Sequence, residues 1–592
     1  MPFQVSPGVV VTERDLTTVV PNVATSIGAI AGEYQWGPVL ERVRITTENE
    51  LVRVFGKPNL RTSADYWTAA NYLSYTNNLI VVRNVNSDAY NATVGDDDAA
   101  PNSNNVKMYN LEEHDKQTDA VFQAGSDCLF LAKYPGEFGN SLKVLAIDKH
   151  GWDLARTAYD AGTATADQTT FITSFDGAPG TSTDVTKAGG SMDEMHIIVI
   201  DEDGDFAGEP GEVLERHAYI SKAVDAKRID GSSNYVGNVL RSQSQYIWMG
   251  DKTEFTANST GAGSDVGAAK TSTFKQFNNA AVAKTILGGS LTGGTAGSIA
   301  TDGQRMAAYD MFGDVETVDI TLVMSGAGNT VVGRYIVDNI AGTRKDCVAF
   351  VSPNKASVVH PASQSAAVTA LKTDNTNLGS SNYAVMDGAW KYQYDRYRDE
   401  FIYVPMNGDM AGLCARTDYT NDPWWSPAGY TRGTVKNILR PSWEPRKADR
   451  DEMYKVSINP IITQPGAGVL LFGDKTMQVI PSAFDRINVR RLFIVLEKAI
   501  SIAAKSLLFE FNDEFTSAQF VNIVSPFLRE VQGRRGITDF KVVCDTSNNT
   551  GQVIDTNNFV GDIYIKPARS INFIQLNFIA ARTVVSFSEI GG

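Results

Sequence analysis

Two long amphipathic helices are predicted near the carboxyl end of this chain, between residues 484 and 533. In the first, one set of apolar residues recurs at helical spacing and shares a face: Val489, Leu492, Phe493, Leu496, Ile500, Ala503 and Leu507. The second opens with Thr516 and Gln519, which fit a capping box, and Gly533 is expected to end it. Helices of this kind need a partner surface, so residues 484–592 are predicted to form a packed module.

The rest of this module is β-rich and carries little catalytic chemistry. Two β-prone runs follow the helices, Asp562–Lys566 and Ile571–Ala580. A basic stripe, Arg491, Lys498 and Lys505, lies opposite the apolar face of the first helix, and it fits a solvated face or a contact surface. The block pairs no nucleophile with a base, which indicates an assembly module and not an active site.

Length and charge exclude several classes of function. A chain of 592 residues is expected to hold several domains. Its net charge of -15 argues against direct nucleic-acid binding, which needs a basic surface. Four widely spaced cysteines predict reduced thiols and no metal site. The start of the chain does not resemble a signal peptide, and lysines interrupt the most apolar helix, so no membrane insertion is expected.

Two glycine-rich segments resemble nucleotide-binding loops but depart from them. In Gly468–Thr476 an acidic residue, Asp474, stands before the lysine, where it would repel phosphate. Ser325–Gly333 follows a predicted strand, but Val331 occupies the place of the third glycine. We therefore expect a strand–turn–strand and a tight strand-to-helix turn here, with no cofactor.

Metal binding is not expected elsewhere either. Asp201–Asp205 has the acidic spacing of a calcium loop, with Glu212 at its twelfth position, but Phe206 replaces the glycine of the sharp turn. A turn with solvated carboxylates is therefore favoured. The five histidines are scattered. Aromatic and arginine clusters at Trp390–Arg398 and Trp424–Arg432 are typical of interfaces and equally of domain cores.

Several segments along the chain carry a recognisable family pattern. Near the carboxyl end these are Asn488–Phe493, Phe509–Asn512, Gly561–Tyr564 and Ser570–Ile574. Near the amino end they are Ser6–Asp15, Gly32–Pro38, Phe55–Pro58 and Val81–Val85, and in the interior Ile200–Glu215 and Pro423–Gly433. In these segments the chain resembles the tail sheath proteins of contractile-tailed bacteriophages.

The resemblance and the changes in composition together predict an α+β / α/β multidomain fold with nested, discontinuous domains. Residues 1–23 with 481–592 are expected to form an inner, tube-facing polymerisation domain with terminal arms. Residues 24–90 with 315–480 are expected to form a middle α/β domain, which contains a β–α–β unit over Val318–Ser352. Residues 91–190 and 191–314 are expected to be two β-rich outer insertions on polar joints. The polar stretches are Asn91–Asn105, Ala161–Gly190 and Thr256–Gly303.

The resemblance implies a structural subunit and not an enzyme. Such subunits stack as hexameric rings around a tail tube protein, between baseplate and tail terminator proteins, in a virion tail assembled in the host cytoplasm. Contraction drives the tube through the host envelope for genome delivery, without cofactor or nucleotide. Two alternatives are the sheath of a phage-like particle, such as a bacteriocin or secretion system, and a virion protein whose insertions act as a glycan-binding adhesin.

Two sets of residues are the candidate contact sites. Short β-prone arms near both ends are expected to link subunits by strand addition: Gly8, Val9, Val10, Val11, Thr12, Thr583, Val584, Val585, Ser586 and Phe587. Arg529, Arg534 and Arg535 cluster where the second helix ends, and we expect them to face an acidic tube surface.

Overall fold

The computed structural model describes residues 24–95, 106–116, 128–250, 255, 259–260, 263–277 and 286–572. The chain divides into two compact units. Among the described residues, unit 1 consists of 417–427 and 481–572, and unit 2 of 24–416 and 428–480. The boundary near residue 416 falls within helix α14 (Asn407–Thr420).

A seven-stranded sheet is the centre of unit 2, in the order β19-β15-β14-β13-β1-β3-β2. Only β2 runs antiparallel to its neighbour. The strands are β1 (Gly28–Gly32), β2 (Arg42–Ile45), β3 (Leu79–Arg83), β13 (Leu322–Met324), β14 (Val348–Val351), β15 (Ala384–Asp387) and β19 (Ile458–Asn459). Its parallel strands are buried and nearly continuously apolar, as expected when helices cover both faces.

The predicted β–α–β unit is confirmed, because β13 and β14 pair in parallel and a helix joins them. That helix begins as α10 (Thr330–Tyr335) and continues with π-helical bonding to Ala341. The other helices of this part are α1 (Glu48–Phe55), α2 (Ser63–Leu73), α9 (Asp302–Asp310), α11 (Gly342–Arg344), α12 (Lys355–Val358), α13 (Gln364–Leu378) and α15 (Lys447–Lys455). The smaller sheets are β17 (Glu400–Pro405), β16 (Trp390–Asp395) and β18 (Arg440–Pro441), and β20 (Ile461–Gln464) with β21 (Gly468–Leu471).

Close packing of α2 on β1 explains why residue 28 is a glycine. A Cβ added to Gly28 would lie 2.5 Å from the Tyr72 ring, well inside van der Waals contact. The Tyr72 hydroxyl donates to the Ser26 carbonyl at 2.9 Å, so the ring is fixed in place.

Between β3 and α9 the chain forms a second layered body built on two antiparallel sheets. One has the order β12-β6-β7-β8 and the other β4-β5-β9. The strands are β4 (Thr93–Val94), β5 (Phe130–Ala132), β6 (Leu142–Asp148), β7 (Glu194–Asp201), β8 (Glu212–Ser221), β9 (Ile247–Met249) and β12 (Ile286–Ser290), with the short pair β10 (Ser259–Thr260) and β11 (Gln276–Phe277). The helices are α3 (Leu111–Lys116), α4 (Lys149–Asp160), α5 (Ala166–Ser174), α6 (Thr183–Ala188) and α7 (Val236–Gln243).

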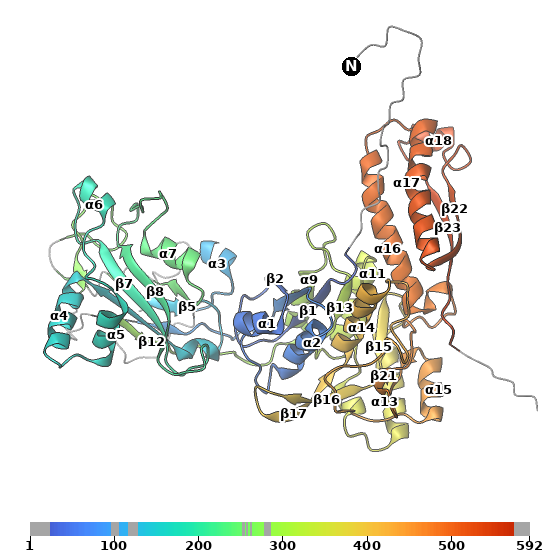
Figure 1. Cartoon of the computed structure of the whole chain (residues 1–592), viewed down its shortest axis with the longest axis horizontal. Helices are drawn as coiled ribbons and strands as arrows, with labels where there is room; N and C mark the ends of the chain where they lie inside the picture. The colour runs from blue at the N-terminus through green and yellow to red at the C-terminus, as the bar shows by residue number, and fades with distance from the viewer. Residues whose placement is uncertain are drawn as a thin grey trace, which may run out of the picture. The chain divides into compact units, whose positions relative to one another are not determined.

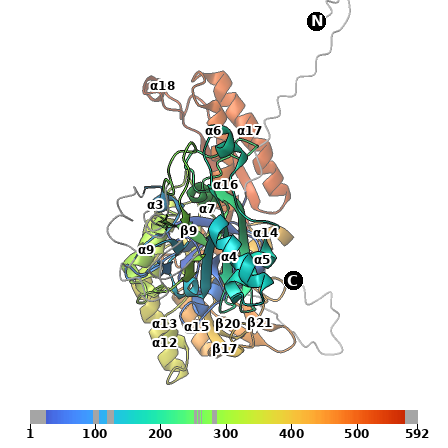
Figure 2. The same ribbon diagram turned by 90° about the vertical axis from the view of Figure 1, so that its left-hand side faces the viewer.

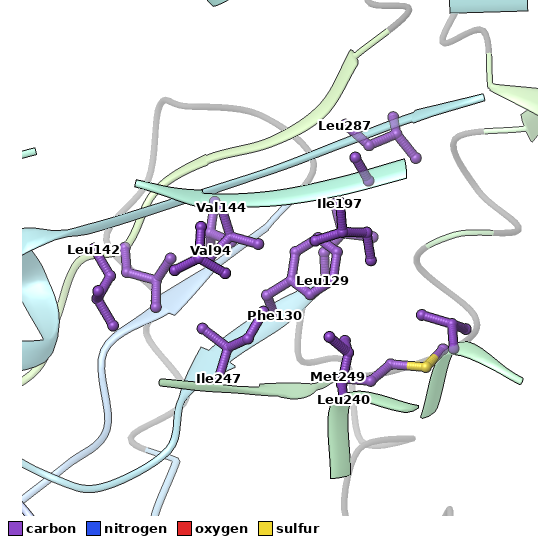
Figure 3. Close-up of a cluster of buried hydrophobic side chains, with 14 of the residues drawn as sticks. Val94, Leu129, Phe130, Leu142, Val144, Ile197, Leu240, Ile247, Met249 and Leu287 are labelled. Carbon is purple, nitrogen blue, oxygen red and sulfur yellow. The ribbon is translucent and has the colours of Figure 1, made fainter. Parts of the chain in front are cut away.

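Alternation along β6 and β7 gives this body two cores. Val144 and Ile197 point into the core between the two sheets, which Figure 3 shows with Phe130 and Ile247. Leu145 and Ile198 belong to a separate cluster under α4 and α5, the helices that face the viewer in Figure 2. Because β6 pairs with β7, strands from both sides of the expected boundary at residue 190 belong to one sheet.

Two details of this insertion differ from the sequence-based expectations. Residues 161–190, expected to be a polar joint, contain α5, which begins with a capping box at Thr165 and Gln168. Asp201 is buried and not solvated. Its carboxylate accepts from the Ser141 hydroxyl at 2.6 Å and from backbone N–H groups of the following turn, so it holds the turn in shape.

The chain enters and leaves the insertion at one place. Tyr90 and Thr295 form an antiparallel bridge, and each backbone N–H donates to the other carbonyl at 3.0 Å. A second bridge joins Thr93 and Thr292. The two connecting segments are therefore adjacent.

A buried polar cluster lies at the carboxyl ends of β14 and β15. The Ser352 hydroxyl donates to Asp387 at 2.5 Å, and Asn407 donates from its backbone to the same hydroxyl at 3.0 Å. Lys391 and Asp409 form a fully buried ion pair at 2.9 Å. Burial raises the pKa of Asp387 to about 8, and the Asp409 charge adds to the rise.

This pKa predicts a pH dependence of stability. An unfolded aspartate titrates near about 4, so between about pH 4 and pH 8 the folded chain holds a proton on Asp387 that the unfolded chain releases. The free energy of unfolding therefore falls as pH rises through that window. We expect Asp387→Asn to make the urea midpoint of the unassembled protein less dependent on pH between 5 and 8. An unchanged dependence in the variant would contradict this.

Candidate assembly surface

Unit 1 is built on two helices and a hairpin. Helix α16 (Ile487–Ala504) runs alongside α17 (Glu514–Gly533), and the hairpin of β22 (Ile537–Val543) and β23 (Asp562–Pro567) packs on α17 (Figure 1). Short turns precede and follow α16 at Ala483–Asp485 and Lys505–Leu507, and α18 (Gly551–Asp555) joins the two strands. Their common core is Trp424, Leu492, Leu496, Phe520, Val524, Leu528, Val531, Ile537 and Cys544.

The predicted apolar face of α16 is confirmed, but the predicted start of α17 is wrong. Leu492 and Leu496 are buried in the core. Helix α17 begins at Glu514, because the Asp513 carboxylate accepts from the Thr516 backbone N–H at 2.9 Å and caps it one turn earlier. Its last helical residue is Gly533, as expected.

The basic stripe of α16 does not form one solvated face. Arg491 is buried, and its guanidinium makes a two-pronged ion pair with Asp418 at 2.7 and 2.5 Å. Lys498 is half-buried and Lys505 is exposed. Arg491 therefore holds the segment 417–427 against α16, and the prediction of a solvated or contact role is wrong for this residue.

The same segment also holds the end of α17. The Trp424 ring is buried, and its Nε1 donates to the Arg534 carbonyl at 3.1 Å. Asp422 pairs with the Arg534 guanidinium at 2.5 Å. Burial raises the pKa of Asp422, although the positive charge of Arg534 opposes the rise. These contacts fix where the chain turns after the helix.

The three candidate arginines lie close together at this end of unit 1. Arg534 is half-exposed and stacks on Trp424, with its guanidinium 5.6 Å from the ring centre. Arg535 lies at the same distance from the Trp425 ring. Arg529 is exposed just before the last turn of α17. A tube-facing role for the three stays a prediction.

Asp418, Asp422 and Trp424 were not among the sequence-derived site residues. The adjacent tryptophans were the only signal, and it fitted an interface or a core equally; for Trp424 the structure decides for a core.

The terminal arms, Gly8–Thr12 and Thr583–Phe587, lie outside the described residues, and their role stays a prediction. Within the part of the chain that the structure describes, β22 and β23 pair only with each other, so each strand has one outer edge without a strand partner.

The motifs resembling nucleotide-binding loops have structural roles. The strand in the first is confirmed as β21, and the Lys475 ammonium donates to the Tyr454 carbonyl at 2.7 Å. In the second, Asn329 caps α10 and the Asp65 carboxylate accepts from the Ala327 N–H, which confirms the tight turn.

Across the described ranges, no three potential metal-ligating side chains gather. Among those residues, none of the helices combines the length and apolarity of a membrane span.

Known proteins match this chain over almost its whole length. A family model described as "Phage tail sheath protein central domain" matches residues 300–477, and one described as "Phage tail sheath C-terminal domain" matches residues 480–581. The tail sheath protein of Vibrio phage KVP40 is 34% identical over 99% of both chains. That of Enterobacteria phage T4 is 33% identical, also over 99% of both.

A solved structure agrees in fold. The sheath tail protein of Listeria innocua aligns over 92% of each chain, with a TM-score of 0.52 and 11% identity, so this likeness concerns the fold alone. The predicted multidomain fold with helices and several sheets is confirmed. The length and identity of the phage matches settle the family: this chain belongs to the phage tail sheath proteins and is a structural subunit of a contractile sheath.

Proposed function

We propose that this subunit stacks as hexameric rings around a tail tube, between baseplate and tail terminator proteins, after synthesis in the host cytoplasm. When the sheath shortens, it drives the tube through the host envelope. The work comes from the free-energy difference between two packings of the same subunits, so no catalysis and no nucleotide are needed. The observation that carries the proposal is the likeness to phage tail sheath proteins along the full chain.

We propose further that the terminal arms link neighbouring subunits through the β22–β23 hairpin. The hairpin offers two outer edges, and the chain has two β-prone end segments. An extended segment added to an open edge gains main-chain hydrogen bonds without needing a large apolar surface. Such a link lets domains shift against each other while the polymer stays connected.

Removing either arm is expected to prevent polymerisation. Chains lacking residues 1–23 or 581–592 leave one hairpin edge of each neighbour without its added strand. We expect soluble, folded monomers under conditions in which the full chain forms hollow, striated tubes in electron micrographs.

Matched controls lack only residues 2–5, or only 591–592, and so keep the β-prone segments. Both controls are expected to polymerise like the full chain. Normal tubes from both arm deletions would reject the linking role, whereas a full chain that forms no tubes would reject the sheath proposal itself.

We propose that the insertion between Tyr90 and Thr295 is peripheral to assembly. Because its two connections are hydrogen-bonded neighbours, a short Gly–Ser linker can replace residues 91–294 without stretching the remaining chain. The excised protein is expected to fold and to form tubes, measured by electron microscopy and sedimentation.

Buried contacts cross the cut, among them the hydrogen bond from the Arg83 guanidinium to the Pro135 carbonyl at 2.7 Å and the packing of one aromatic ring. Trp36 is buried in the insertion core, where it packs on Phe138 and Phe206. Excision exposes this ring, so a second version carries Trp36→Gln to prevent aggregation. If this soluble, folded version forms no tubes, the insertion takes part in assembly and is not peripheral.

A further inference from the structure

The two ends of unit 1 differ in charge. At the end where α17 stops, the turn Gly533–Gly536 and the end of β23 meet, because the Ala568 N–H donates to the Gly536 carbonyl at 3.1 Å. The exposed cations here are Arg529, Arg534, Arg535 and Arg569. Of these, Arg534 pairs with Asp422, while the other three have no ion-pair partner among the described residues. We call this the basic end.

The opposite end carries exposed apolar side chains, and we call it the apolar end. It lies about 30 Å away, the length of a 20-residue helix. Its surface side chains are 63% to 104% exposed: Leu508, Phe509, Phe511 and Phe515. The Asn512 side chain donates to the Asn558 carbonyl at 2.7 Å, which brings the partly exposed Phe559 and Val560 to the same end. Figure 1 shows α18 at this end of α17.

Carboxylates surround the apolar end. Glu510, Glu514 and Asp555 are exposed and, within the described part of the chain, form no ion pair. Lys505 is the cation nearest to Glu510 and Glu514 along the chain. Acidic residues at the start of α17 and arginines at its end also complement the helix dipole. That effect accounts for charges but not for three water-exposed phenylalanine rings.

The exposed rings indicate a contact surface. Soluble monomers rarely expose contiguous large apolar side chains, and a patch of this kind rimmed by charges marks an interaction site. Phe509 has φ +71°, a left-handed conformation that a bulky residue adopts only at a cost, so the backbone holds this fully exposed ring outward against its local preference.

The chemistry of the basic end complements that of the apolar end. Three cations without ion-pair partners match three such carboxylates. Arg535 stacked over Trp425 also presents a flat surface on which a phenylalanine ring can pack. A surface that complements another surface of the same chain favours a second copy as its partner.

We propose that the apolar end of one subunit docks on the basic end of another copy. This contact is head-to-tail, and a head-to-tail contact produces either a ring or an open helix. It therefore adds a direct contact between unit 1 modules to the links made by the arms. The inference rests on the proposed function only in requiring that the chain polymerises.

The test compares two full-length variants in tube-free polymerisation. Phe509→Ser with Phe511→Ser removes two exposed rings, and Arg529→Glu with Arg535→Glu reverses the basic end while sparing the Arg534–Asp422 pair. Each is expected to raise the critical concentration for polymerisation at least tenfold, measured by sedimentation, with circular dichroism unchanged. Matched controls are Ile229→Ser and Lys187→Glu, exposed residues of the insertion.

A charge exchange identifies the partner. Adding Glu510→Arg and Asp555→Arg to the reversed basic end restores opposite charges across the contact, so polymerisation is expected to recover. Failure to recover, or normal polymerisation of either starting variant, overturns the proposal. A reversed basic end that polymerises normally yet no longer decorates tail tubes assigns the arginines to the tube instead. An unmodified chain that does not polymerise overturns the proposed function and this contact together, whereas the variants test the contact alone.

Discussion

The buried ion pair between Arg491 and Asp418 is the constraint on which unit 1 depends. It joins a helix to a segment 73 residues earlier in the chain. A buried ion pair stabilises a fold little more than a well-packed apolar pair does. Removing one partner of the ion pair, however, typically lowers the free energy of unfolding by about 3–5 kcal/mol. The pair therefore contributes mainly to geometry, because it fixes the position of Asp418. Asp422 and Trp424, a few residues later, are thereby placed against the end of α17.

Periodic patterns in the sequence predicted the elements of the fold well. The apolar repeat of α16, the strand–helix–strand unit at β13–β14 and the end of α17 at Gly533 all follow from local spacing. Helix starts were less predictable, since Asp513 and Thr516 both have side chains that cap, and only the fold decides which one does. Family resemblance, and not spacing, predicted the function.

Contacts between distant residues escaped prediction for a physical reason. An arginine on the polar face of a predicted helix is expected to be solvated unless its partner is known. The sequence around Arg491 contains no signal that Asp418 is that partner. Likewise, the acidic residues that begin at Asp201 predict a surface turn. The structure instead places Ser141, 60 residues away, in hydrogen-bond contact with Asp201. The pairing of β6 with β7 across residue 190 is of the same kind. Contacts between residues far apart in the chain therefore account for these differences between expectation and structure.

The paired segments at Tyr90 and Thr295 also bear on how such a chain evolves. Because the insertion begins and ends at a single hydrogen-bonded bridge, recombination there exchanges the whole body without altering the register of the seven-stranded sheet. Trp36 is one residue outside the insertion that such an exchange must accommodate. On the proposal that the insertion is peripheral to assembly, selection acting on it can remodel this body while the modules that meet in the polymer keep their sequence.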